Sequence, residues 1–358
     1  MEIGVYTFGD LPFGVSGAAA AQQRLQEIVA AARLADDAGL HVFGMGEHHR
    51  TDYAVSAHSV VLGAIASATQ RIRLTSAVTI LSSADPVRVF EEFATLDLLS
   101  GGRAEIMAGR GAFIESFPLF GFDLQDYDSL YEEKLDLLLQ LNRNAQVTWR
   151  GRHRAALHQA EVAPRPLHGQ MPIWIGAGGT PQSAVRAGQL GLPLNLANIG
   201  GQPAQFRPFI DLYRQTGLQA GHAPAQLQVA VSAHCHIQKD SQQAREQFYP
   251  HYKRYFKHNL PQRDRGWEMS RTDFEQLAGP RGCLFVGSPQ EIIDKILYEH
   301  ELFGHQRFLA QLDIGGLPYP QVAQSIELLA THVLPAVQKS LGQPFIHPSD
   351  SQHEFQPH

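Results

Sequence analysis

Short apolar runs alternate with longer amphipathic stretches along almost the whole chain. The runs are mostly apolar on both faces, as strands buried in a parallel sheet are. The stretches between them place apolar residues at helical spacing. The predicted strands are residues 2–8, 41–45, 72–80, 103–108, 172–177, 192–197, 227–237 and 306–312. The predicted helices are residues 21–39, 57–69, 86–99, 129–142, 181–190, 203–216, 241–257, 289–302 and 320–337.

A strand followed by a helix, repeated eight times, implies parallel pairing. This pattern predicts an α/β fold, the (β/α)₈ TIM barrel with insertions. An open doubly wound sheet is the alternative, but no Gly-x-Gly-x-x-Gly follows the first strand. Residues 147–162 are predicted to form a hairpin insertion, and the polar residues 260–282 a lid or an irregular loop. We expect one domain over residues 1–340 and a loose tail at residues 341–358.

Composition narrows the classes of function. The net charge of -6 offers no basic surface for nucleic acid or an anionic membrane, and no apolar run is long enough to cross a bilayer. The amino end has no basic segment followed by an apolar one, so we expect no signal peptide and a cytoplasmic location. Cys235 and Cys283 match neither a disulfide framework nor a zinc spacing and are expected in the core.

The stretch at residues 44–50, Gly-Met-Gly-Glu-His-His-Arg, follows the second predicted strand. In a (β/α)₈ barrel the loops at the carboxyl ends of strands carry the chemistry. Glu47, His48 and His49 can orient, donate and accept protons there, with Glu47 fixing the tautomer of a neighbouring imidazole. Only Glu47 and His49 share a face of an extended strand, so no metal site is expected. The alternative is that all three are polar residues closing the loop.

A glycine-rich turn at residues 176–181 links the fifth strand to the next helix. Such a turn exposes backbone N–H groups at the positive end of a helix, which predicts a phosphate site. Thr180 can cap that helix and donate its hydroxyl. Arg110, between two glycines after the fourth strand, would add positive charge; the alternative for Arg110 is an ion pair near the rim of the barrel.

His234 and His236 alternate along the seventh strand and therefore share a face. A His-x-His pair also occurs in metallohydrolase barrels, but there it lies on the first strand, and residues 2–8 contain no histidine. We expect the pair to line a pocket rather than to bind metal.

Together these motifs resemble the bacterial luciferase-like monooxygenases, a flavin-dependent family with a (β/α)₈ barrel. The resemblance spans about residues 1–337. It rests on residues 46–49 (Gly-Glu-His-His), 75–88, 99–103 (Leu-Ser-Gly-Gly-Arg), 109–111 (Gly-Arg-Gly) and 174–181.

The resemblance implies a monooxygenase that uses reduced FMN and molecular oxygen to oxidise a small organic substrate. A separate NAD(P)H:flavin reductase would supply the reduced flavin, because no nicotinamide fingerprint is present. Residue by residue, it implies a non-proline cis peptide at Ala77 and Val78 beneath the flavin ring, and a catalytic role for His48. The residues that it implies at the phosphate are Arg110, Ala177, Gly178, Gly179 and Thr180.

Three residues, at two places in the chain, differ from luciferase. Ala177 and Gly178 replace a Glu and a Ser, and Gly109 replaces a cysteine of its α-subunit, which argues against light emission but not against flavin binding. The family also implies a homodimer formed through the predicted helices 57–69 and 86–99. Two alternatives stay open: a deazaflavin-dependent oxidoreductase on the same barrel, and a flavin-binding protein without catalysis.

Overall fold

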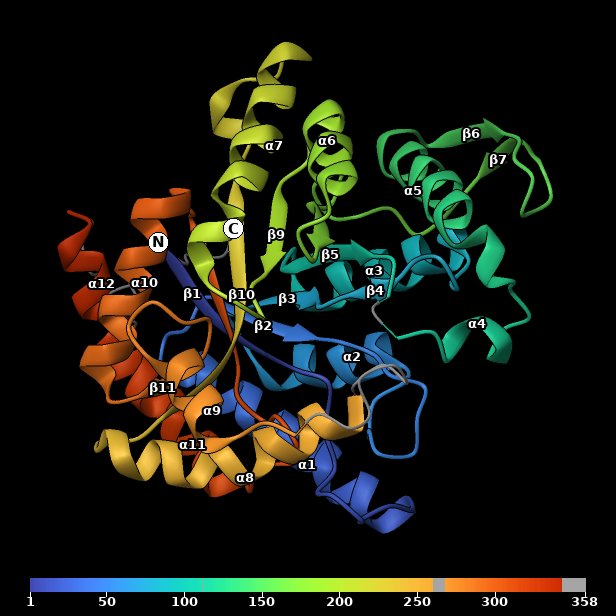
Figure 1. The fold of residues 1–358 in the computed structure, drawn as a ribbon. Coiled ribbons are helices and arrows are strands. Elements are labelled where there is room, and N and C mark those ends of the chain that lie inside the picture. Colours follow the sequence, from blue (N-terminus) through green and yellow to red (C-terminus); the bar gives the residue numbers. More distant parts are fainter. Residues whose placement is uncertain (112, 260–267, 343–358) are drawn as a thin grey trace, which may run out of the picture.

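The computed structural model describes residues 1–111, 113–259 and 268–342. Within these ranges, eight parallel strands pair in a closed ring (Figure 1). In order around the ring they are β1 (Glu2–Thr7), β2 (Val42–Met45), β3 (Arg73–Ser76), β5 (Ala104–Gly109), β8 (Ile173–Ala177), β9 (Leu194–Ala197), β10 (Val229–Ile237) and β12 (Arg307–Gln311). Because β12 pairs with β1, the ring closes, and the predicted (β/α)₈ barrel is confirmed.

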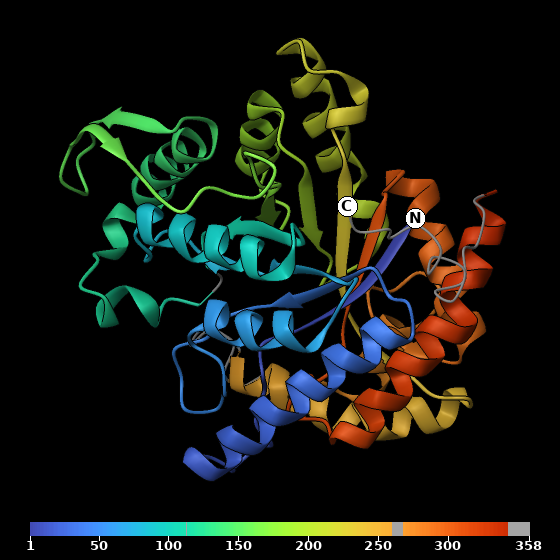
Figure 2. The ribbon, with the colours of Figure 1, turned by 180° about the vertical axis from the view of Figure 1, so that it is seen from behind.

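The helices lie around the outside of this barrel (Figure 2). They are α1 (Ala18–Asp37), α2 (His58–Ala68), α3 (Pro86–Ser100), α5 (Tyr127–Arg143), α6 (Pro181–Leu190), α7 (Arg207–Gln219), α8 (Ser241–Asn259), α10 (Pro289–Phe303), α11 (Tyr319–Leu328) and α12 (Leu334–Ser340), with a π-helical turn at Leu329–Val333. Local signals explain their ends. In α3, for example, the Asp85 side chain accepts hydrogen bonds from the first turn, and Gly101 closes the helix at a φ of 70°. None of the described helices is long and apolar enough to span a bilayer.

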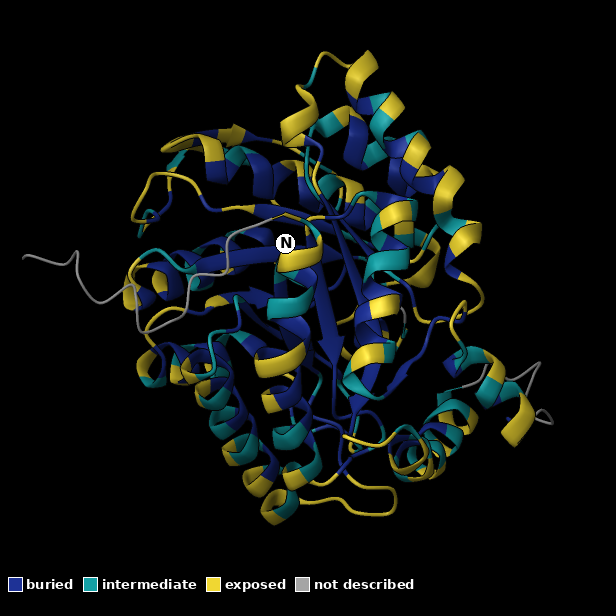
Figure 3. Ribbon diagram, turned by 90° about the vertical axis from the view of Figure 1, so that its left-hand side faces the viewer, coloured by how far each residue is buried: buried dark blue, intermediate teal, exposed yellow. Residues whose placement is uncertain are grey.

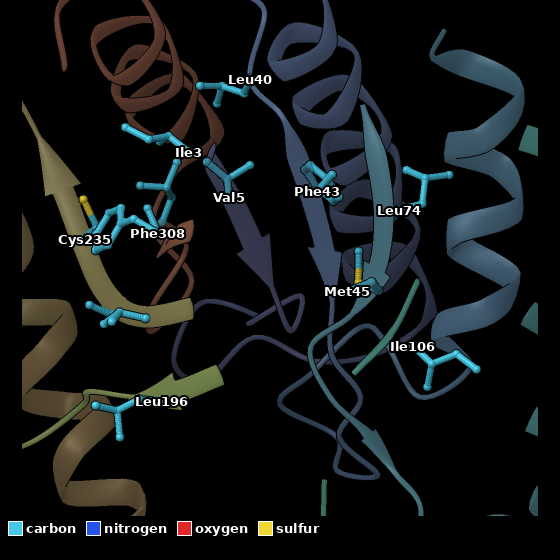
Figure 4. Close-up of a cluster of buried hydrophobic side chains, with 14 of the residues drawn as sticks. Ile3, Val5, Leu40, Phe43, Met45, Leu74, Ile106, Leu196, Cys235 and Phe308 are labelled. Carbon is cyan, nitrogen blue, oxygen red and sulfur yellow. The ribbon is translucent and has the colours of Figure 1, made fainter. Parts of the chain in front are cut away.

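Two apolar layers hold the barrel together. The larger one fills the space between strands and helices, and Figure 4 shows part of it, with Ile3, Phe43 and Phe308 among its members. The smaller one fills the barrel itself and contains Tyr6, Val42, Ala77, Met107, Trp174, Ala230 and Leu309. Strands are therefore buried on both faces, whereas the outer faces of the helices are exposed (Figure 3).

Some predictions about local structure need correction. The single strand predicted at 72–80 is broken, because β3 ends at Ser76 and a short strand, β4 (Thr79–Ile80), resumes after Ala77 and Val78. The hairpin predicted at 147–162 is confirmed as β6 (Gln146–Trp149) and β7 (Leu157–Glu161).

The prediction of a lid or irregular loop at residues 260–282 is wrong for the second half of this segment. Residues 271–278 form helix α9 (Arg271–Ala278), because Ser270 and Asp273 make a reciprocal capping box at its start. A short strand, β11 (Phe285–Gly287), was not predicted and pairs with the end of β10. Residues 260–267 lie outside the described residues, as do residues 343–358 of the predicted tail.

Candidate active site

At the mouth of the barrel, after β3, Ala77 and Val78 are joined by the predicted cis peptide bond. Glycines make room for this pair. A Cβ on Gly109 would lie 2.5 Å from Val78 Cγ2, and one on Gly176 would lie 2.6 Å from Val78 Cγ1. A Cβ on Gly46 would lie 2.8 Å from the Ala77 carbonyl oxygen. The Val78 side chain occupies the space that a larger residue at position 109 would need, and this explains the glycine there.

Glu47 leaves the end of β2 and is buried at 8% exposure. Its Oε1 accepts a hydrogen bond of 2.6 Å from the Ile80 N–H, and its Oε2 lies 3.2 Å from His49 Nε2. Glu47 and His49 therefore share a face, as predicted. Burial alone would raise the pKa of Glu47, but the hydrogen bond with His49, the nearby His58 ring and the Ile80 N–H together lower it below its usual value.

His58, at the first turn of α2, extends this polar group and was not predicted as a site residue. Its Nδ1 lies 3.6 Å from Glu47 Oε2, and its Nε2 lies 2.8 Å from Thr79 Oγ1. Burial lowers the pKa of His58, so the ring is neutral near pH 7. The available signal was its position at the start of the helix that follows residues 44–50.

His48 lies in an aromatic box. Its ring centroid is 4.7 Å from that of Phe8, 4.2 Å from Tyr53 and 4.8 Å from Phe113. Its Nδ1 lies 3.0 Å from Glu115 Oε1, so the carboxylate that orients His48 is Glu115. Burial would raise the pKa of Glu115, but the hydrogen bond with His48 outweighs it and the pKa is lowered.

Glu115 was not predicted as a site residue, although a signal was present in the sequence. Glu115 is the one charged residue in the aromatic stretch at residues 111–122. A carboxylate alone in such a stretch needs a polar partner when it folds against a buried surface.

Arg110, at the end of β5, contacts the start of α6. Its guanidinium donates to Thr180 Oγ1 at 3.1 Å and to Ser183 Oγ at 3.4 Å. It also donates to Asp128 Oδ1 at 2.7 Å, which is the ion pair given above as the alternative for Arg110. Ser183 was not predicted as a site residue. Thr180 holds the N-cap position, but its hydroxyl lies 2.8 Å from Ser183 Oγ and does not cap the helix, which corrects that expectation.

The glycine turn before α6 leaves its backbone accessible. A Cβ on Gly178 would meet no heavy atom within 4 Å, and Gly179 adopts a φ of +100°, which favours glycine. Ala177 is buried at the end of β8. The exposed glycine turn before α6, two hydroxyls and a guanidinium together fit a phosphate group.

The charged and hydrogen-bonding groups of this site come from β2, β3, β5 and β8, which are consecutive neighbours in the barrel, and from the segments that follow these strands. The other candidates are not in contact with these groups: His234 and His236 are buried on β10, and Cys235 and Cys283 are buried free thiols. In the part of the chain that the structure describes, no group of three or more His, Cys, Asp or Glu side chains is placed to hold a metal ion.

A closed parallel barrel with polar side chains at the carboxyl ends of its strands defines the protein as a (β/α)₈ barrel with an enzyme-type site. The sequence pattern of the family described as luciferase-like monooxygenase matches residues 1–306. The chain therefore belongs to the luciferase-like monooxygenases and is an oxidoreductase of that family.

Two curated relatives illustrate the match. The uncharacterized protein y4wF of Sinorhizobium fredii is 33% identical over 186 residues, which cover 51% of this chain and 53% of that one, about half of each. The oxygenase component of a flavin-dependent trigonelline monooxygenase from Acinetobacter baylyi is 25% identical over 349 residues, covering 89% of this chain and 91% of that one.

Solved structures share the fold. The oxygenating constituent of 3,6-diketocamphane monooxygenase from Pseudomonas putida, in complex with FMN, matches at a TM-score of 0.74 and 20% identity, covering 94% of this chain and 98% of that one. The coenzyme F420 dependent tetrahydromethanopterin reductase from Methanopyrus kandleri matches at a TM-score of 0.71 and 21% identity, covering 94% of this chain and 99% of that one.

Proposed function

We propose that this protein is an FMN-dependent monooxygenase, which uses reduced FMN and molecular oxygen to oxidise a small organic substrate. The observation that carries the proposal is one mouth of the barrel that combines a phosphate-type cluster, the Ala77–Val78 pair packed against glycines, and two imidazole–carboxylate pairs. The flavin-dependent monooxygenase among the relatives supports the flavin, and the FMN complex of the diketocamphane enzyme supports FMN.

In this proposal the cluster at the start of α6 binds the FMN phosphate. Arg110 supplies the positive charge, Thr180 and Ser183 supply hydroxyls, and the turn at Gly178 and Gly179 supplies backbone N–H groups. The flavin ring would lie against Ala77 and Val78, and the Val78 side chain packs against the glycines in β5 and β8.

Bound reduced flavin supplies the electrons that activate oxygen, and the protein orients the reactants and excludes water. His48, held by Glu115, would donate or accept the proton that the oxidation requires. His49 is held in the same way, by the carboxylate of Glu47. Glu47 and His48 are 8% and 7% exposed, so proton transfer at these groups would be shielded from bulk water.

The remaining partners follow from the same proposal. A separate NAD(P)H:flavin reductase would supply reduced FMN in the cytoplasm. A homodimer would form through α2 and α3, whose exposed apolar side chains include Val60 (71% exposed) and Leu99 (66% exposed).

A deazaflavin-dependent oxidoreductase is the second candidate, because the F420 dependent reductase has the same fold. Anaerobic titration with reduced FMN and with reduced F420 separates the two. We expect reduced FMN to bind at least tenfold more tightly. Tighter binding of reduced F420 would favour the second candidate, and FMN binding without any substrate oxidation would favour a non-catalytic flavin carrier.

A further inference from the structure

Three polar side chains line the inside of the barrel on adjacent strands. Tyr6 of β1 is paired in register with Gln311 of β12, and Gln311 with His234 of β10. They point inward, since Ala230 belongs to the apolar layer inside the barrel and side chains alternate along a strand, which places His234 on the same face. We call these three residues the inner polar row.

Two members of the inner polar row are buried without partners. Gln311 is 1% exposed and His234 is 3% exposed. Among the described residues, neither Gln311 Nε2 nor His234 Nδ1 has a hydrogen-bond partner. The His234 ring instead packs against the rings of Tyr252 and Tyr255, each at 5.6 Å. Buried polar groups are rarely left unpaired in proteins, so this row is suited to a bound ligand.

The surroundings of the row select for a neutral ligand. Burial lowers the pKa of His234 to about 3, so its imidazole is uncharged at pH 7. Burial first, and then Tyr255, Asp313 and Asp10, raise the pKa of Tyr6, so the ionisable groups acting on its hydroxyl are acids. A tyrosine O–H and an amide NH₂ are donors, and a neutral imidazole donates from one ring nitrogen and accepts at the other. Because none of the three side chains carries a positive charge, they suit a neutral acceptor oxygen better than a carboxylate.

The row lies across the barrel from the proposed cofactor site. In the ring of strands, β10, β12 and β1 are opposite β3, β5 and β8, which carry the cis pair, Arg110 and the glycine turn. Phe8 connects the two halves, because its ring is 5.9 Å from that of Tyr6 and 4.7 Å from that of His48. A ligand on the row would therefore lie near His48.

The loops at this mouth also expose large apolar side chains. Phe13, in the loop after β1, is 67% exposed, and Ile114 and Phe120, in the loop after β5, are 56% and 51% exposed. Such side chains suit the apolar body of a ligand whose polar end reaches the row.

We propose that Tyr6, Gln311 and His234 determine substrate specificity by binding the neutral acceptor oxygen, such as a ketone or aldehyde carbonyl, of an otherwise apolar substrate. This inference rests on the proposed function, since it takes the opposite half of the mouth to be filled by FMN. The cofactor would be bound by residues on β3, β5 and β8, not by the inner polar row.

The test compares three small probes by ligand-observed NMR, with and without FMN: 2-hexanone, 2-methyl-1-hexene, in which a methylene replaces the carbonyl oxygen, and hexanoate. We expect the protein to bind the ketone about five- to tenfold more tightly than the alkene, the range of one neutral hydrogen bond. Hexanoate should bind more weakly than the ketone. In Gln311→Leu and in His234→Phe the preference for the ketone should fall toward one, while FMN affinity stays within about twofold of the unmodified protein.

His305→Phe is the matched control, because His305 is as buried as His234 but lies before β12, at the opposite end of the barrel. It should keep the preference. Tyr6→Phe removes a single oxygen and should also lower the preference for the ketone, so it serves as the test if a larger change prevents folding.

The inference is overturned if the unmodified protein binds ketone and alkene equally or binds neither, if the variants keep the preference, or if hexanoate binds best. Failure to bind FMN, measured in the same samples, would instead overturn the proposed function.

Discussion

Replacement of Thr180 by alanine removes one hydroxyl from the proposed phosphate cluster. In the structure this hydroxyl accepts from Arg110 at 3.1 Å and lies 2.8 Å from Ser183 Oγ. A hydrogen bond to a charged group contributes about 1.5–3 kcal/mol. Thr180→Ala should therefore weaken FMN binding by about 10- to 100-fold.

Asp128→Asn should act in the opposite direction. Asp128 pairs with Arg110 at 2.7 Å, and its side chain is 69% exposed. Exposed ion pairs contribute about 0–1 kcal/mol, so release of Arg110 should tighten FMN binding by up to about fivefold. Added salt should reduce this gain, because exposed charges are screened.

Both changes are measured by quenching of flavin fluorescence, with FMN and with riboflavin, which lacks the phosphate. Riboflavin affinity should change little in either variant. Thr331→Ala is the control, since the Thr331 hydroxyl bonds within its own helix to the Glu327 carbonyl and is exposed. Equal losses for FMN and riboflavin in Thr180→Ala, or weaker FMN binding in Asp128→Asn, would refute the assignment of the phosphate site.

Other variants test the remaining roles. With chemically reduced FMN, His48→Ala should keep FMN affinity within a few-fold while product per oxygen consumed falls by about 10²–10⁴-fold and hydrogen peroxide rises; a collapse of FMN affinity with normal coupling would make His48 a binding residue. Because the pKa of Glu47 lies below its ordinary value of 4.5 in the folded protein, its carboxylate adds stability that is present above that value and is lost as the pH falls through the folded-state pKa. The excess unfolding free energy over Glu47→Gln should therefore shrink below about pH 4.5 in thermal melts, and a pH-independent difference would contradict this. Finally, the protein should be dimeric at micromolar concentration by light scattering, and Val60→Glu should make it monomeric.

The barrel could be predicted from the sequence because buried parallel strands and amphipathic helices have different apolar periods. The alternation is strong enough to locate every strand of the ring. The break in the strand at 72–80 could not be derived from apolar pattern, since Ala77 and Val78 suit a strand as well as their neighbours do. Helix α9 was missed because its residues, 271–278, are mostly polar, although Ser270 and Asp273 carried a capping signal.

The site was predicted only in part. Residues that follow a strand directly, such as Glu47 and Arg110, are placed by the topology of the barrel. Their partners depend on how loops far apart in sequence fold together: Glu115 reaches His48 across 67 residues, and Ser183 reaches Arg110 across 73. The inner polar row was missed for the same reason, because the register of β1, β12 and β10 is a property of the closed barrel.

The most direct test of the proposed monooxygenase is isotopic. Chemically reduced FMN and oxygen-18 gas would be supplied to the protein together with a panel of neutral carbonyl compounds, and the products analysed by mass spectrometry. The account predicts that at least one compound gains a single oxygen-18 atom, only when both protein and reduced FMN are present. It would be contradicted if no compound gained oxygen-18 while reduced F420, in the same assay, supported reduction of the panel.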